Sequence, residues 1–170
     1  IKKKKYSNYL KPSHKVNILK ATVFKLPNRI KKNEITFGSK IKITDNNSKF
    51  LKFANGWIKK SDVKPISFKE KDPFRKITCF RNIRYKWGGK SFKGIDCSAL
   101  VQVFLNFNNI FCPRDAKDQI KYFKKNIKLK NIKKNDIIFW KGHVAVALSS
   151  KKLIHAYGPM KKTVIMDINQ

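Results

Sequence analysis

The segment from residue 96 to residue 108, DCSALVQVFLNFN, constrains the fold more than any other part of the chain. Its apolar residues recur at the spacing of one helix face, and Val101 and Leu105 make the opposite face apolar as well. A helix that is apolar on nearly all sides must be buried. We therefore expect a helix over residues 96–108 that other elements cover.

The sequence on both sides of this helix alternates as β-strands do. Residues 14–66 contain short strands separated by turn signals, among them Asn46-Asn47 and Asn55-Gly56, which favours a small β-barrel. From Asp136 the strand pattern returns in DIIFWKGHVAVAL, KLIHAYG and KTVIMDI. A β-module followed by helices and an antiparallel sheet predicts an α+β fold.

Two shorter helices are expected between these regions, after a polar linker that begins at residue 67. Asp72 and Pro73 suit the start of a helix over residues 73–83, in which Cys79 would lie in the core. A third helical stretch is expected near residues 115–125.

The net charge of +31 could attract nucleic acid or another anionic partner. However, only five of the 41 cations are Arg, and Arg is the side chain that binds phosphate in a bidentate way. The Lys residues are also spread along the whole chain. We interpret them as a solvated surface and expect no specific nucleic-acid partner, with a wall-binding or nucleic-acid-binding module as the alternative.

No window approaches the ~18 uninterrupted apolar residues of a membrane span. The first residues, IKKKKYSNYLKPSHK, contain a basic cluster but no apolar signal segment and no initiator Met. The three cysteines form no disulfide framework and no metal-binding spacing, so no cofactor is expected. Free thiols favour a cytoplasmic location, and a periplasmic or secreted one is the alternative if a leader is missing.

Cys97 is the candidate nucleophile. It follows Gly88, Gly89 and Gly94, which allow another chain segment to approach closely. The start of a helix lowers the pKa of a thiol and offers backbone N–H groups as an oxyanion hole. We therefore expect Cys97 to be a reactive thiol of low pKa.

The candidate bases are His143 and His155, on neighbouring predicted strands. They face the same side only if the connecting loop has an odd number of residues. A three-residue loop over 149–151 would make them diagonal neighbours. One imidazole would then take the proton of the Cys97 thiol while the other orients it. A zinc site formed by these three residues is the competing interpretation, and it lacks a fourth ligand.

Asp96 has two interpretations. A carboxylate beside a thiol should raise the pKa of that thiol, which does not help a nucleophile. Asp96 can cap the helix, or it can bind a cation of the substrate, and the two roles are compatible.

Three separated motifs resemble the NlpC-type bacterial cell-wall cysteine peptidases over about residues 72–168. They are YKWGG followed by GIDCSALVQ, DIIFWKGHVA, and LIHA. The segment CPRDAKDQ, residues 112–119, is also similar to that family, although Ala99 stands where the family usually has Gly. The resemblance implies a papain-like peptidase domain over residues 72–170, with Cys97 as nucleophile, His143 as base and His155 as the orienting residue.

The same resemblance implies the substrate and the remaining modules. Tyr85 would lie near the oxyanion site, and Asp96 and Ser98 would bind the free amine of an N-terminal L-Ala. The expected reaction is cleavage of the γ-D-glutamyl–diamino acid bond of peptidoglycan stem peptides, in recycling or remodelling, with acyl transfer to another acceptor as an alternative. Residues 14–66 would be a bacterial SH3-like module, and residues 1–13 the remnant of a preceding module or a linker.

Overall fold

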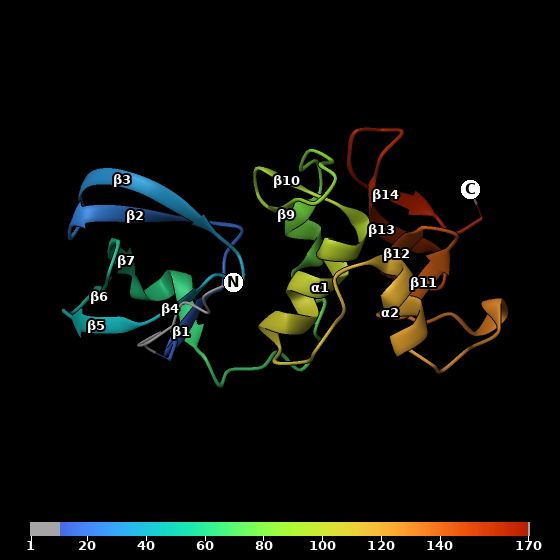
Figure 1. The fold of residues 1–170 in the computed structure, drawn as a ribbon, viewed down its shortest axis with the longest axis horizontal. Coiled ribbons are helices and arrows are strands. Elements are labelled where there is room, and N and C mark those ends of the chain that lie inside the picture. The colour runs from blue at the N-terminus through green and yellow to red at the C-terminus, as the bar shows by residue number, and fades with distance from the viewer. Residues whose placement is uncertain (1–10, 170) are drawn as a thin grey trace, which may run out of the picture.

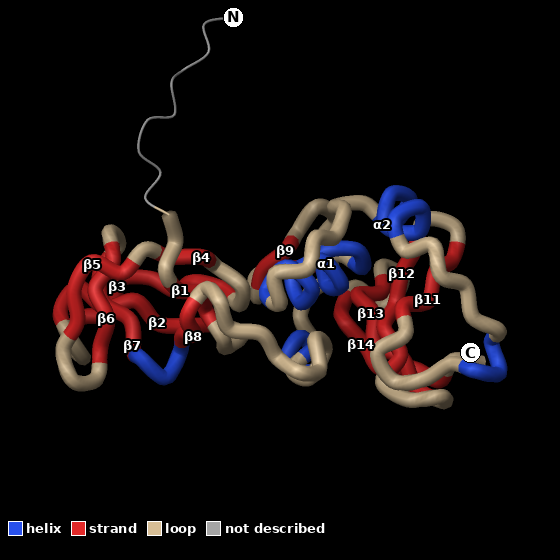
Figure 2. The backbone as a smooth tube through the Cα atoms, turned by 90° about the horizontal axis from the view of Figure 1, so that it is seen from below, coloured by secondary structure: helices blue, strands red, loops and turns tan. Residues whose placement is uncertain are grey.

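The computed structural model describes residues 11–169, which form a β-rich N-terminal region beside a mixed C-terminal region (Figure 1). Most of the expected remnant at residues 1–13 lies outside the described residues. Seen from below, the two regions lie next to each other along the long axis (Figure 2). No helix within residues 11–169 is long and apolar enough to cross a membrane.

Short antiparallel strands make up the N-terminal region, in line with its alternating sequence. A five-stranded sheet has the order β3-β2-β7-β6-β5, and a three-stranded sheet has the order β4-β1-β8. Apolar residues from both sheets, such as Val16 and Ile58, form one core. The elements are β1 (His14–Val16), β2 (Lys20–Leu26), β3 (Arg29–Thr36), β4 (Lys40–Ile41), β5 (Ile43–Asn46), β6 (Phe50–Phe53), β7 (Gly56–Lys59), the 3-10 turn η1 (Lys60–Asp62) and β8 (Val63–Pro65).

These two sheets do not close into the expected barrel within residues 11–169. The chain leaves the smaller sheet after Ile41 and enters the larger one at Ile43. The β5–β6 pairing also shifts register between Ile43 and Asp45. An irregularity of this kind bends a strand and lets the chain pass from one sheet to another. The result is a pair of packed sheets.

The C-terminal region packs helices on an antiparallel sheet of order β11-β12-β13-β14, as the α+β prediction requires. Its elements are the 3-10 turn η2 (Ile77–Phe80), β9 (Lys90–Ser91), β10 (Gly94–Ile95), α1 (Cys97–Phe107), α2 (Ala116–Tyr122), the 3-10 turn η3 (Leu129–Asn131), β11 (Ile137–Trp140), β12 (His143–Ala147), β13 (Lys152–Tyr157) and β14 (Lys162–Asp167).

The prediction of a helix over residues 73–83 is wrong, because only the short turn η2 forms there. Its end is set by Asn82, which has a left-handed backbone (φ 66°) and donates its N–H to the carbonyl of Thr163 at 2.8 Å. The chain therefore turns towards β14 before a helix can continue. Cys79 is exposed, not in the core as expected, whereas Ile77 and Phe80 on the same turn are buried.

Helix α1 is the buried element that the sequence predicts. Asp96 caps it, accepting the N–H of Ala99 at 2.8 Å. One side of α1 lies on β12 and β13, against Val144 and Ile154, and apolar residues from segments before and after the helix belong to the same core.

The two regions share part of this core. Phe37 follows β3, yet its ring stacks on Phe104 and Phe107 of α1, with centroid distances of 4.7 and 4.6 Å. The ring is 3% exposed. The N-terminal region therefore covers one face of the helix that begins at Cys97.

A buried lysine makes the second link between the regions. Lys15 of β1 is fully buried, and its ammonium donates to the carbonyl of Phe68 at 2.5 Å and to the carbonyl of Phe107. Phe107 is the last residue of α1, where helix carbonyls lack partners and the helix dipole favours a cation. Lys15 thus caps the C-terminal end of α1 from the other region.

Candidate active site

Cys97 begins α1 and is 7% exposed. The backbone N–H groups of Val144, Ser98 and Cys97 itself lie close enough to lower the pKa of the thiol. Val144 directly follows His143, so its contact with the thiol places the start of β12, which carries His143, next to the start of α1. The thiol and the strand that carries His143 therefore meet at one end of the sheet.

The glycines before Cys97 allow this close packing. A Cβ on Gly89 would lie 2.6 Å from the carbonyl oxygen of Gly94, and a Cβ on Gly94 would lie 2.6 Å from the side chain of Lys86. Gly94 also has a φ of +153°, which L side chains rarely adopt. The predicted need for open backbone before Cys97 is confirmed at Gly89 and Gly94.

The expectation of a low pKa for Cys97 is wrong for the protein without substrate. Burial raises the pKa of the Cys97 thiol above its ordinary value, and the Asp96 carboxylate adds to this effect. The three backbone N–H groups oppose the shift without reversing it. The thiol therefore needs a base to lose its proton.

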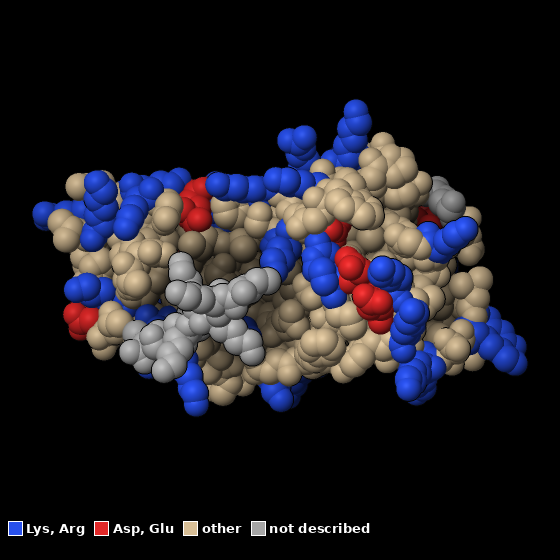
Figure 3. All heavy atoms as spheres, in the orientation of Figure 1, with Lys and Arg blue, Asp and Glu red and all other residues tan. Residues whose placement is uncertain are grey.

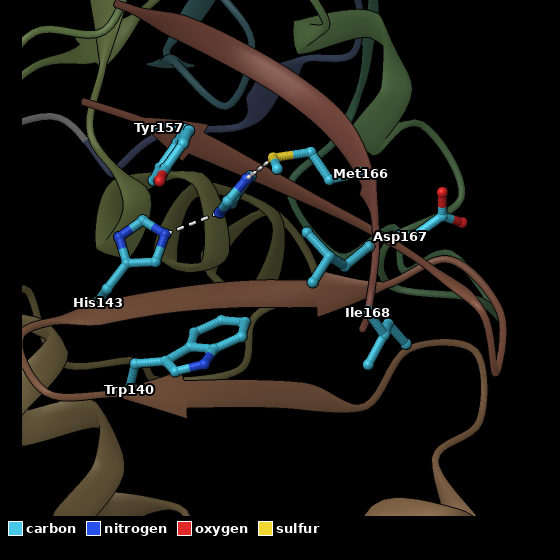
Figure 4. Close-up of a pocket in the computed structure, with 8 residues that line it drawn as sticks. Trp140, His143, Tyr157, Met166, Asp167 and Ile168 are labelled. Carbon is cyan, nitrogen blue, oxygen red and sulfur yellow. Dashed lines mark hydrogen bonds between the residues drawn. The ribbon is translucent and has the colours of Figure 1, made fainter. Parts of the chain in front are cut away.

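That base is available in the pair formed by His143 and His155. The pairing of β12 with β13 continues to Leu148, whose N–H donates to the carbonyl of Lys152 at 2.8 Å. The loop that connects the two strands therefore consists of the three predicted residues 149–151. His143 Nε2 lies 2.8 Å from His155 Nδ1 (Figure 4). The expectation that the two imidazoles are diagonal neighbours on one face is confirmed.

Both imidazoles are neutral near pH 7. Burial lowers the pKa of His143. Burial also lowers the pKa of His155, and the neighbouring His143 lowers it further, to about 4. A neutral imidazole holds a lone pair and can accept a proton from a thiol. Because His143 Nε2 points to His155, its Nδ1 atom is the one left to do so.

His155 is held on two further sides. Its ring stacks on Tyr157, with a centroid distance of 4.7 Å and an interplanar angle of 9°, and its Nε2 lies 3.2 Å from Met166 Sδ. A cavity of about 320 Å³ opens beside the imidazole pair. Mainly apolar side chains line it (Figure 4), among them Trp140, Leu153 and Ile168.

Asp96 is the centre of a saturated polar cluster. Its carboxylate accepts hydrogen bonds from the N–H groups of Gly88 and Ala99 and from the Ser98 hydroxyl, at 2.8 to 3.2 Å. Arg114 adds two more, at 3.0 and 2.5 Å. The predicted cap is therefore confirmed, and the negative charge is paired with a cation.

Ser98 and Tyr85 lie in the same neighbourhood. The Ser98 hydroxyl is buried and accepts a hydrogen bond from Arg114 at 3.0 Å. Burial raises the pKa of Tyr85, with contributions from Cys97 and Asp96, so its phenol remains a hydrogen-bond donor beside the thiol.

Sequence reasoning did not single out Arg114 or Gln119 as site residues. Gln119 is fully buried, and its amide donates to the carbonyls of Ser98 and Pro113 at 2.9 Å. Both residues lie in the segment CPRDAKDQ, whose Pro-Arg…Gln pattern was the available signal. They tie the loop before α2 to the first turn of α1.

The cationic side chains form no single patch on the visible face. Lys and Arg are scattered over both regions in Figure 3, with the acidic side chains between them.

Within the part of the chain that the structure describes, no cluster of three or more His, Cys, Asp or Glu side chains could hold a metal ion. The arrangement at Cys97 and His143 instead suits chemistry by a thiol nucleophile and a general base.

Comparison with known proteins agrees with this fold. The sequence model of the NlpC/P60 family matches residues 82–170, about half of the chain. The chain therefore belongs to the NlpC/P60 family. The solved structure of an NlpC/P60 family protein from Bacillus cereus superposes with a TM-score of 0.79 over 94% of this chain and 59% of that one, at 22% identity. That likeness concerns the fold, and it includes the N-terminal β region.

Two curated relatives carry more specific names. The γ-D-glutamyl-L-lysine dipeptidyl-peptidase of Bacillus subtilis is 29% identical over 69% of this chain and 43% of its own length. Dipeptidyl-peptidase 6 of Lysinibacillus sphaericus is 39% identical over 42% of this chain and 27% of its own length. The chain thus spans less than half of the length of either relative.

Proposed function

We propose that the chain is a cysteine peptidase that hydrolyses the γ-D-glutamyl–diamino acid bond of peptidoglycan stem peptides. The observation that carries this proposal is the 2.8 Å contact between His143 and His155 at the end of the sheet where Cys97 begins α1. The name of the Bacillus subtilis relative supports the choice of bond.

In the proposed reaction, His143 Nδ1 takes the proton of the Cys97 thiol as sulfur attacks the γ-glutamyl carbonyl carbon. The backbone N–H of Cys97 and the hydroxyl of Tyr85 stabilise the oxyanion that forms. His143 then gives its proton to the leaving amine, and the carbon–nitrogen bond breaks to leave a thioester. Water, deprotonated by His143, attacks the thioester carbon, and the carbon–sulfur bond breaks to release the acid. His143 returns the proton to the Cys97 sulfur, and His155 orients His143 throughout.

We further propose that Asp96 and Ser98 select substrates with a free N-terminal L-Ala amine. Both residues flank Cys97 at the N-terminal end of α1, which supports a position close to the substrate. Because the Asp96 carboxylate already accepts five hydrogen bonds, an ammonium group would share its oxygens with Arg114. Selection for a released peptide would suit recycling in the cytoplasm, where the free thiols of this chain are stable.

The division into an SH3-like module over residues 14–66 and a papain-like peptidase domain over residues 72–170 belongs to the same proposal. Short strands in two packed sheets support the first assignment. The contact of α1 with β12 and β13 supports the second.

The test is turnover of L-Ala-γ-D-Glu-diaminopimelate by the purified chain, followed by mass spectrometry of the products. Cys97→Ala should lower the rate by roughly a thousandfold or more while peptide binding persists. Cys112→Ala, which removes another buried thiol, should retain activity. An N-acetylated peptide should react more slowly if the amine is recognised, and an amide or ester product in place of the acid would indicate acyl transfer.

The alternative, a binding module that uses its lysines, predicts a different result. The wild-type chain would then release no product, and its binding to wall polymer or nucleic acid would weaken steeply with salt. That outcome would overturn the peptidase proposal.

A further inference from the structure

We infer that Met166 is a positioning residue that determines which nitrogen atoms of His143 and His155 carry protons. This inference rests on the proposed function, since it concerns the base that would activate Cys97. Met166 has no role in the chemistry described above, and its sulfur atom contacts the orienting imidazole.

The side chains of His143, His155 and Met166 form a chain of contacts across the neighbouring strands β12, β13 and β14. The β13–β14 register pairs His155 with Val164, so Met166 lies diagonally across the ladder from His155. The β12–β13 register places His143 diagonally on the other side. The contacts are 2.8 Å between His143 Nε2 and His155 Nδ1, and 3.2 Å between His155 Nε2 and Met166 Sδ (Figure 4).

The thioether of Met166 fixes the direction in which hydrogen bonds are donated along this chain of contacts, because it can accept a hydrogen bond but cannot donate one. His155 must therefore carry its proton on Nε2. In a neutral imidazole the other nitrogen, Nδ1, is then an acceptor, and it accepts the proton on Nε2 of His143. The lone pair of His143 is left on Nδ1, the atom that faces away from His155.

The opposite arrangement would disable the proposed base. If His155 carried its proton on Nδ1, His143 would have to present its lone pair on Nε2 and its proton on Nδ1. The Cys97 thiol would then meet an N–H group in place of a lone pair. Tyr157 cannot prevent this by itself, since stacking on the ring face fixes the plane of the imidazole but not the position of its proton.

The low pKa of His155, about 4, supports the assignment. The imidazole stays neutral over the physiological range, so a choice between two tautomers exists. When His143 becomes an imidazolium during the reaction, its Nε2–H still donates to the lone pair on His155 Nδ1. Met166 thus allows His155 to act as a neutral acceptor, the role an amide oxygen plays in related triads.

The experiment replaces the thioether while keeping its volume. Met166→Leu removes the acceptor, and Met166→Gln offers an amide that can either accept or donate. Nitrogen NMR of labelled histidine reports which ring nitrogen of His155 is protonated, and steady-state kinetics report kcat and KM. Met160→Leu is the matched control, because Met160 is the only other methionine in the chain and is 49% exposed.

We expect the wild type to carry the His155 proton on Nε2 and Met166→Leu to show a mixture of both forms. The kcat of Met166→Leu should fall roughly three- to tenfold, the value expected for one weak hydrogen bond, with little change in KM. Across the wild type and both variants, kcat should follow the fraction of His155 protonated on Nε2.

A wild-type proton on His155 Nδ1 would overturn the inference. So would a loss of kcat in Met166→Leu with an unchanged tautomer, which would indicate a merely structural role. The NMR measurement does not depend on turnover. A wild-type protein with the expected tautomer but no peptidase activity would therefore refute the proposed function and not the placement of the protons.

Discussion

The ammonium group of Lys15 in β1 donates a hydrogen bond to the carbonyl oxygen of Phe107, the last residue of α1. The same ammonium donates to Phe68 and lies 4.7 Å from the centre of the Phe107 ring. A buried cation is expensive unless several acceptors replace its water. Here backbone carbonyls and an aromatic face do so, and the helix that carries Cys97 is held from the N-terminal region.

We predict that Lys15→Met lowers the free energy of unfolding by roughly 2–4 kcal/mol, because it leaves the buried carbonyl of Phe107 and the partly buried carbonyl of Phe68 without this donor. Lys40→Met is the control, since Lys40 is exposed on the strand directly opposite Lys15. Urea denaturation of both variants measures the difference. Equal stability of the two variants would show that the contact with Phe107 contributes nothing.

Removal of Arg114 should be costly because Asp96 would remain buried without a cation. We expect Arg114→Gln to lower the free energy of unfolding by roughly 2–4 kcal/mol. Arg75→Gln should change it by less than about 0.5 kcal/mol, since Arg75 is 70% exposed in its ion pair with Glu70. The double variant Asp96→Asn/Arg114→Gln should regain part of the loss, and the absence of any recovery would contradict charge pairing as the cause.

Acid should destabilise the protein through His155. Its pKa falls from 6.5 to about 4 on folding, so between these values the unfolded chain binds more protons than the folded one. Stability therefore rises with pH across this window and is lost as pH falls towards 4, by on the order of 3 kcal/mol. Burial also lowers the pKa of His143, so its effect on stability has the same sign.

Denaturation of the wild type and of His155→Gln at pH 7 and pH 4.5 measures this effect. Acidic side chains contribute equally to both proteins, so the difference between the two pH dependences isolates the imidazole. The same dependence in both proteins would mean that His155 does not titrate as the structure indicates.

Alkylation of Cys97 should accelerate with pH. Burial raises the pKa of this thiol, so the thiolate fraction, and with it the rate, should grow about tenfold per pH unit between pH 6 and 8. A variant with Cys79→Ser and Cys112→Ser isolates Cys97. A rate that is already constant below pH 7 would instead indicate a preformed thiolate–imidazolium pair.

Cys112 provides the comparison for this measurement. It is 2% exposed, and burial raises the pKa of its thiol to about 12. In a variant with Cys79→Ser and Cys97→Ser it should react far more slowly than Cys97 over the same range. A similar rate at both sites would remove any distinction between a core thiol and the proposed nucleophile.

Local patterns in the sequence were enough to predict α1, the strands after Asp136 and the pairing of the two histidines on those strands. The apolar segment after Asp96 became α1, and the odd loop over 149–151 put His143 and His155 on one face. Both outcomes depend on strict geometric periods, 3.6 residues in a helix and two in a strand. Such periods can be counted along a single sequence.

The predictions that failed did so because they depend on contacts between residues far apart in the sequence. The helix expected over residues 73–83 satisfied local rules, but the bond from Asn82 to Thr163 ended it. Arg114 and Lys15 bond to partners far along the chain, and no local pattern indicates which partner a cation will find. The pKa of Cys97 was misjudged for the same reason, since burial is a property of the assembled core.

The stacking of Phe37 on two rings of α1 bears on how this protein can be divided into fragments. A cut in the polar linker near residue 67 looks harmless in the printed sequence. It would nevertheless expose an aromatic face of the helix that begins at Cys97 and leave Phe107 without its cation. Anyone who transplants residues 72–170 into a chimera should carry over that covering surface or redesign it.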